Sequence, residues 1–283
     1  MPAAEHAGRI KEPRKGGSTL RSSPTTQFKF LAAAFALFGL ASNAPSAPVQ
    51  SPLVGWPWIM RIAASAKVED VVTPPLGASE PRPLVVAVHG AGDRPDWACG
   101  GWRIGIESYA FVVCPMGLPM AGAVYGWGST RNITTAVDRA IAAVREKFPG
   151  YVGTGPTIYA GFSQGATLAS DFLIKNGARF PVAVIAEGGY DYLANSVFAH
   201  RYHAAGGRRI LILCGTPGCF VNAKRAKSIA EREGLDAIVT GDPKAGHNLN
   251  GLMQQALQRD WYRLVAGIEG WESYPNHRWK KQN

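Results

Sequence analysis

The motif Gly-Phe-Ser-Gln-Gly at residues 161–165 fits the pattern G-x-S-x-G, in which the central residue, Ser163, can act as a nucleophile. Residues 157–160 before it are short and apolar, as in a buried strand, and residues 166–176 after it have helical spacing. A tight strand-to-helix turn exposes the serine, and glycines on both sides let the backbone pack closely. We therefore expect nucleophilic chemistry at Ser163. The alternative is a structural turn whose serine caps the helix.

A serine hydroxyl is a weak nucleophile and needs a base within hydrogen-bond reach. His247, in a loop just after a predicted strand at 236–240, is a candidate for this base and, later, for the acid that protonates the leaving group. His200 and His203 form an H-x-x-H pattern, but no third metal ligand lies near them in the sequence.

Acyl transfer places negative charge on a carbonyl oxygen, which backbone N–H groups can stabilise by about 3 kcal/mol each. The residues His89-Gly90-Ala91-Gly92 follow a predicted strand at 84–88, and the two glycines permit close approach of the backbone to a ligand. The H-G-x-G pattern of this segment resembles an oxyanion loop, and that resemblance gives His89 a structural role. The alternative is an ordinary turn at a strand end.

The elements that must position these residues alternate between strands and helices. Continuous apolar runs predict strands buried on both faces, and a peripheral strand is expected at 67–72. Together they predict an α/β fold with a mostly parallel central sheet and helices on both faces. The segment 187–209 is too short for a large lid domain. The buried strands are expected at 84–88, 110–114, 157–160, 182–186, 210–214 and 236–240, and the helices at 133–148 (capped by Asn132 or Thr134), 166–176, 223–233 and 249–268.

The N-terminal region has the organisation of a secretory signal peptide. Six basic and two acidic residues occupy positions 1–29, and a 12-residue apolar run follows at 30–41. That run is too short to span a bilayer comfortably, and small residues come after it. We predict a signal peptide and leader at 1–47, a single domain at 48–283, and a secreted or periplasmic location. An uncleaved N-terminal membrane anchor is the alternative.

Four cysteines in an exported chain suggest disulfides. Three pairings are possible, and we favour Cys99–Cys114 and Cys214–Cys219. The members of each pair are close in sequence and lie at the mouth of a predicted strand. Zinc is disfavoured because the chain has no C-x-x-C pair and no histidine close to the cysteines, and we expect no metal or cofactor.

The formal net charge is +10, part of which lies in the N-terminal region and the C-terminal tail. The chain has no repeated basic–aromatic stripe and no nucleic-acid motif, so we interpret the charge as a solvated surface and expect no nucleic-acid partner. We expect a monomer.

The order of these pieces resembles the α/β-hydrolase superfamily, as in a secreted bacterial-type serine esterase without a large lid domain. The resemblance covers about residues 65–270. It rests on the motif around Ser163, the loop at 89–92, and Ala245-Gly246-His247-Asn248 before the last helix. It implies Ser163 as nucleophile and His247 as base, with the Ala91 and Gln164 N–H groups as the oxyanion hole.

The third member of the triad departs from the usual pattern. Most members of the superfamily carry an aspartate after the penultimate strand, but residues 214–222 contain no acidic side chain. Some relatives take the acid from the end of the preceding strand, where Glu187 is our first choice and Asp191 the second. Asp242 is third. Alternatively, a backbone carbonyl or Asn222 holds the histidine.

These observations predict a secreted serine hydrolase that cleaves a carboxylic ester, in a small molecule or a polymer. The alternatives are a peptidase or acyltransferase of the same fold, or a binding protein that keeps the fold without turnover. Aromatic residues near the strand ends either line an acyl or aryl pocket or belong to the core. They are Trp97, Trp102, Tyr125 and Trp127.

Overall fold

A computed structural model of the chain describes residues 50–65 and 68–275. The predicted signal peptide and the alternative anchor, both within 1–47, lie outside the described residues, as does the basic tail at 276–283. The leader and domain boundaries therefore stay predictions.

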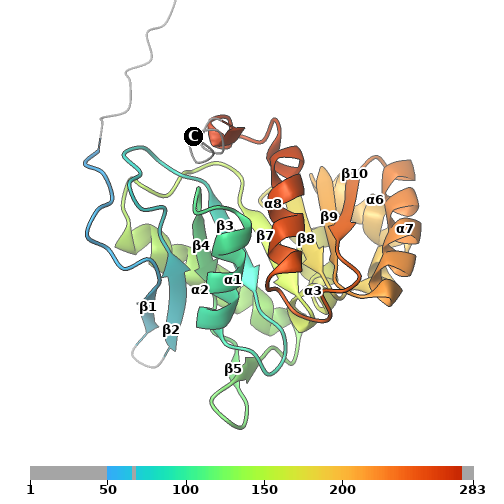
Figure 1. Cartoon of the computed structure of the whole chain (residues 1–283), viewed down its shortest axis with the longest axis horizontal. Coiled ribbons are helices and arrows are strands. Elements are labelled where there is room, and N and C mark those ends of the chain that lie inside the picture. Colours follow the sequence, from blue (N-terminus) through green and yellow to red (C-terminus); the bar gives the residue numbers. More distant parts are fainter. Residues whose placement is uncertain (1–49, 66–67, 276–283) are drawn as a thin grey trace, which may run out of the picture. The chain divides into compact units, whose positions relative to one another are not determined.

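The described chain contains an eight-stranded sheet in which six strands are parallel (Figure 1). The strands are β1 (Met60–Ser65), β2 (Val68–Thr73), β3 (Leu84–Val88), β4 (Phe111–Cys114), β7 (Ile158–Phe162), β8 (Val182–Ala186), β9 (Arg209–Cys214) and β10 (Asp236–Gly241), with a separate hairpin of β5 (Leu118–Pro119) and β6 (Tyr125–Gly126). Their order is β1-β2-β4-β3-β7-β8-β9-β10, and β2 pairs antiparallel with both β1 and β4. The mostly parallel α/β sheet is confirmed.

Helices cover both faces of this sheet, which is why β3 and β8 are buried along their whole length. Side chains of α1 and α8 pack in one apolar cluster, and those of α2, α4, α6 and α7 pack in the cluster on the other face. Figure 1 shows α1 and α8 together in front of the sheet. The helices are α1 (Pro95–Gly105), α2 (Thr130–Lys147), α3 (Gln164–Thr167), α4 (Ser170–Asn176), α5 (Tyr190–Leu193), α6 (Ser196–Ala204), α7 (Pro217–Arg232) and α8 (Leu252–Val265).

Three helix predictions need correction. The cap of α2 is Ser129, whose Oγ accepts the Asn132 N–H at 3.4 Å, rather than Asn132 or Thr134. The single helix expected at 166–176 is two helices, and Thr130 Oγ1 donates to the Leu168 carbonyl at the break. The helix expected from residue 223 begins six residues earlier, because Thr216 caps it and Pro217 occupies its first turn.

Both favoured disulfides are present. Cys99–Cys114 joins α1 to the end of β4, and Cys214–Cys219 joins the end of β9 to the first turn of α7. All four cysteines are buried. Two disulfides are consistent with an extracellular or periplasmic protein.

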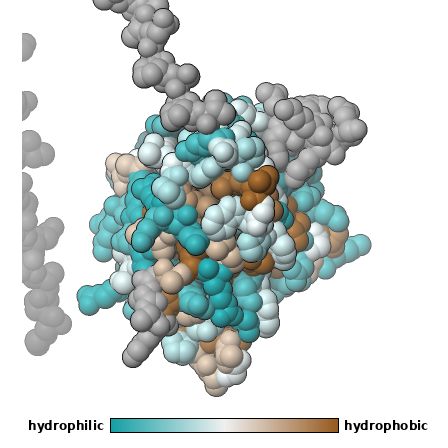
Figure 2. Space-filling view, turned by 90° about the vertical axis from the view of Figure 1, so that its left-hand side faces the viewer, coloured by the Kyte–Doolittle hydropathy of each residue, from teal (hydrophilic) through white to brown (hydrophobic). Residues whose placement is uncertain are grey.

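On the side of the molecule that carries β1 and β2, Figure 2 shows a largely hydrophilic face with scattered hydrophobic patches. The edge strand β1 carries Arg61, which forms an ion pair with Glu69 of β2 at 3.0 Å. Charged side chains of this kind discourage edge-to-edge pairing between sheets. Within the described residues, every helix is too short or too polar to cross a membrane.

Candidate active site

Ser163 lies at the turn between β7 and α3 with φ 50° and ψ −111°, a backbone conformation that L-residues rarely adopt. The glycines on either side make this turn sterically possible. A Cβ on Gly161 would lie 2.8 Å from the Gly165 carbonyl oxygen, and one on Gly165 would lie 2.3 Å from the Val88 carbonyl oxygen. The turn therefore packs directly against the neighbouring strand β3 and leaves the serine side chain projecting from it.

His247 is in the loop between β10 and α8, and its Nε2 lies 2.9 Å from Ser163 Oγ. At this distance the serine hydroxyl can donate to a neutral imidazole, which is the geometry that a general base requires. The imidazole ring also packs on Phe162, with ring centroids 5.1 Å apart. The His247 side chain is 53% exposed, so water reaches the site.

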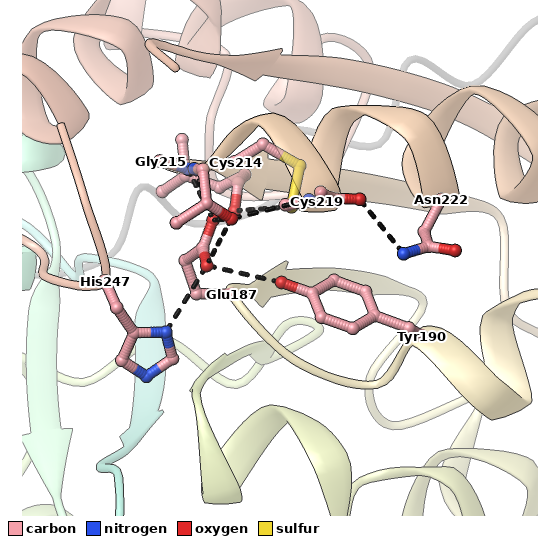
Figure 3. Close-up of a disulfide and its surroundings, with 10 residues drawn as sticks. Glu187, Tyr190, Cys214, Gly215, Cys219, Asn222 and His247 are labelled. Carbon is pink, nitrogen blue, oxygen red and sulfur yellow. Dashed lines mark hydrogen bonds and ion pairs between the residues drawn. A yellow bond between two sulfur atoms is a disulfide. The ribbon is translucent and has the colours of Figure 1, made fainter. Parts of the chain in front are cut away.

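Glu187 follows β8, and its Oε2 lies 3.3 Å from His247 Nδ1 (Figure 3). Its side chain is only 2% exposed. An Nδ1–H that donates to this carboxylate leaves Nε2 free to accept the serine proton. The structure thus brings together Ser163, His247 and the first-choice acid.

The other candidates for the acid lie elsewhere. Asp191 is exposed on α5, and no hydrogen bond or ion pair joins it to His247 in the described chain. Asp242 Oδ1 accepts the Lys244 N–H at 2.8 Å and so stabilises its own turn. Asn222 is turned away from the site and donates to the Gly218 carbonyl (Figure 3).

The predicted oxyanion donors flank the serine. In the described part of the chain, neither the Ala91 N–H nor the Gln164 N–H donates a hydrogen bond to another protein group. Gln164 is fixed by its side chain, whose Oε1 accepts the Trp127 N–H at 2.8 Å. Trp127 Nε1 in turn donates to the His89 carbonyl at 2.8 Å, which connects the two donor segments. Sequence reasoning considered Trp127 only as a pocket or core residue and missed this bridge.

His89 is buried at the start of the oxyanion loop, and in the described chain no hydrogen bond joins its ring to Ser163, His247 or Glu187. Its Nδ1 donates to the Gly90 carbonyl at 2.7 Å, and its ring packs on Trp127 with centroids 4.6 Å apart. Burial lowers the pKa of His89, and the Gly90 hydrogen bond and the nearby Asp93 oppose this in part. His89 is therefore neutral and has a structural place in the loop.

A groove of about 670 Å³ opens beside Ser163 and His247 and runs along α1. Trp58 and Trp97 line it and are 51% and 61% exposed. Trp102 also borders the groove, but its side chain is fully buried, as is that of Trp127. Of the aromatic residues singled out from the sequence, Trp97 is the one available to a ligand in this groove.

Possible metal ligands gather at one place in the described chain, formed by Glu187, Cys214 and Cys219. The two sulfur atoms are bonded to each other, so neither is a thiolate ligand. In the H-x-x-H pattern, His200 pairs with Glu233 at 3.4 Å.

Three residues around Glu187 escaped the sequence analysis: Tyr190, Gly215 and Thr216, all of which donate to its carboxylate. Burial, and next the Glu187 charge, raise the pKa of Tyr190 to about 12, so it remains a hydroxyl donor. The sequence does contain one signal for Thr216, because Thr-Pro is a typical start of a helix.

No family model and no curated protein matches the sequence. Solved structures do match the fold. An uncharacterized protein from Bacillus cereus matches with a TM-score of 0.53 and 12% identity, over 66% of this chain and 60% of that one. Pyrococcus horikoshii acylaminoacyl peptidase matches with a TM-score of 0.52 and 12% identity, over 78% of this chain and 44% of that one, and a ferulic acid esterase with a TM-score of 0.52 and 13% identity, over 71% of this chain and 95% of that one. The chain thus spans less than two thirds of the first two proteins. It has the α/β-hydrolase fold.

Proposed function

We propose that this chain is a serine hydrolase that cleaves carboxylic esters through an acyl-enzyme on Ser163. The observation that carries the proposal is the continuous hydrogen-bonded series from Ser163 Oγ through the two nitrogens of His247 to the buried Glu187. The similarity of the fold to that of an esterase and of a peptidase is compatible with acyl transfer to water.

In the proposed reaction, Ser163 Oγ attacks the ester carbonyl carbon while its proton passes to His247 Nε2. The Ala91 and Gln164 N–H groups stabilise the oxyanion, and each contributes about 3 kcal/mol. His247 then protonates the leaving alcohol as the carbon–oxygen bond breaks. Water, activated by the same nitrogen, cleaves the acyl-enzyme and returns the proton to Ser163.

Hydrolysis is favoured over acyl transfer to another acceptor because the site is open to solvent. The His247 side chain is 53% exposed, and the groove beside it is an open one. A closed site protects an acyl-enzyme from hydrolysis and so favours transfer to another acceptor, whereas an open site admits water. The same mechanism can cleave an amide, with an amine in place of an alcohol as the leaving group. A peptidase is therefore the second candidate.

Labelling with a fluorophosphonate probe tests the proposal. The probe should modify the wild-type chain and leave a folded Ser163→Ala variant unmodified. The wild-type chain should also hydrolyse p-nitrophenyl esters faster than the matching anilides. Absence of labelling in the folded wild-type protein would contradict the proposed mechanism.

We further propose that the mature protein works outside the cytoplasm. The two buried disulfides and the signal-peptide pattern at 1–47 support this location. Titration of thiols in protein purified from its native compartment should find none before reduction and four after it. Free thiols in that protein would count against an oxidising compartment.

A further inference from the structure

The segment 214–219 contains no acidic side chain. In this chain it surrounds an acid that comes from the neighbouring strand. The Gly215 N–H donates to Glu187 Oε1 at 2.5 Å, and the Thr216 N–H donates to the same oxygen at 3.0 Å. These two donors orient the carboxylate so that Oε2 lies toward His247.

The Thr216 hydroxyl adds a third contact from the same segment. Its Oγ1 accepts the Cys219 N–H at 3.4 Å as the cap of α7. It also lies 3.2 Å and 3.1 Å from the two carboxylate oxygens of Glu187. Because the hydroxyl accepts from the helix, its own proton is available to the carboxylate.

The same segment also holds the loop that carries the base. The Asp242 N–H donates to the Cys214 carbonyl at 2.9 Å, and the Gly246 N–H donates to the Gly215 carbonyl at 2.8 Å. The backbone of Gly215 therefore contacts the acid through its N–H and the loop next to His247 through its carbonyl. A Cβ on Gly215 would lie 2.1 Å from the Gly246 carbonyl oxygen, so this approach requires glycine.

The Cys214–Cys219 disulfide closes this segment on itself, between the end of β9 and the first turn of α7. Figure 3 shows the disulfide, Gly215 and Glu187 gathered on one side of His247. Both sulfur atoms belong to residues that are at most 1% exposed, which indicates a permanent bond rather than an accessible redox group.

We propose that the disulfide-closed segment 214–219 is the positioning device of the site. It fixes the position of Glu187 relative to His247. Thr216 is the positioning side chain, and the disulfide constrains the segment. This inference rests on the proposed serine-hydrolase function. The segment carries no acid of its own and orients the one that follows β8.

The first test exchanges the hydroxyl of Thr216. A Thr216→Val variant keeps the shape and removes the donor, and we expect kcat to fall roughly 10- to 100-fold with little change in KM. A Thr216→Ser variant keeps the hydroxyl and should recover most of the wild-type kcat. A role confined to capping α7 would lower the thermal stability of the Thr216→Val variant but leave kcat of the folded variant unchanged, and that result would overturn the assignment. Equal losses of kcat in the valine and serine variants would also overturn it.

The second test compares the two disulfides as double alanine variants. We expect Cys214→Ala with Cys219→Ala to lower kcat about 10-fold or more, because small displacements of catalytic groups are costly. Cys99→Ala with Cys114→Ala is the matched control, and it should retain kcat while losing thermal stability. Equal kcat in both double variants would contradict the inference. If either double variant fails to fold, the Thr216 pair decides.

Labelling separates the two levels of the argument. If the wild-type chain is not labelled by the fluorophosphonate at Ser163, the proposed function itself fails. If the wild-type chain is labelled and turns over, and the Thr216→Val and Cys214/Cys219 variants keep their kcat, only the positioning role fails.

Discussion

At the scale of single residues, Glu187 has more hydrogen-bond partners than the other two members of the proposed triad. Its backbone has φ 48°, in the left-handed region, directly after β8. Its buried carboxylate accepts hydrogen bonds from Gly215, Thr216 and Tyr190. Its Oε2 also lies within hydrogen-bond distance of His247 Nδ1. An acid so fully bonded has a single orientation available, which is what fixing the histidine tautomer requires.

Replacing Glu187 by glutamine should lower kcat by roughly 10³- to 10⁴-fold. The glutamine oxygen would accept from Gly215 and Thr216, which turns its NH₂ group toward His247. That group can only donate, so the imidazole would present a hydrogen at Nε2 and could not accept the serine proton. Initial rates on a p-nitrophenyl ester measure the effect.

The matched control for this substitution is Asp191→Asn, four residues along the chain. Asp191 is exposed and has no described contact with His247, so its variant should keep nearly the wild-type kcat. A larger loss in the Asp191 variant than in the Glu187 variant would reverse the assignment of the acid.

The candidate site was predictable where a residue's role follows from its position at a strand end. Ser163, His247 and Glu187 each follow a predicted strand, and strands of one parallel sheet present their carboxyl ends at the same edge. The hydrogen bond from the Gly215 N–H to Glu187 and the bridge through Trp127 were not predictable. They depend on backbone groups and neutral side chains that only tertiary packing brings together.

At the scale of the elements, the strand-to-helix turn at Ser163 is held by close backbone packing on both of its glycines. β7 lies between β3 and β8, and the first turn of α3 packs back on the end of β3. The apolar runs of these strands were found from the sequence because both faces are buried. By contrast, β1 and the glycine-rich α1 were missed, since an exposed edge strand and a helix with three glycines lack a clear apolar period.

A Gly165→Ala substitution should destabilise the fold and remove activity together. Its Cβ would lie 2.3 Å from the Val88 carbonyl oxygen, a backbone atom that cannot rotate away. We expect a loss of unfolding free energy of about 3 kcal/mol, at the upper end for overpacking, and displacement of Ser163 with α3. Urea unfolding and fluorophosphonate labelling measure the two effects.

Gly155→Ala serves as the control for this change. A Cβ there would meet only the Glu269 side chain, at an ordinary contact distance of 3.4 Å. Its stability and labelling should stay close to those of the wild-type chain. Equal behaviour of the two alanine variants would mean that the turn tolerates a displacement that the geometry forbids.

At the scale of the whole molecule, the sheet separates two apolar clusters, and few polar side chains are fully buried between them. His89 is one of these, at the carboxyl end of β3, and its Nε2 has no described hydrogen-bond partner. A buried imidazole without a partner for a second proton resists protonation, in agreement with its lowered pKa. The stability of the entire fold is thereby coupled to pH.

The free energy of unfolding should therefore fall as the pH drops below about 6.5, the ordinary pKa of histidine. Below that value the unfolded chain binds a proton at His89, whereas the folded chain does not. The free energy of unfolding therefore decreases by up to about 1.4 kcal/mol for each pH unit. Urea unfolding between pH 7 and pH 5 measures this decrease.

A His89→Asn variant keeps a donor near the Nδ1 position for the Gly90 carbonyl, and it should lose most of this slope whatever its absolute stability. His200→Gln, at an exposed histidine, should keep the slope, and an unchanged slope in His89→Asn would show that the acid sensitivity arises elsewhere.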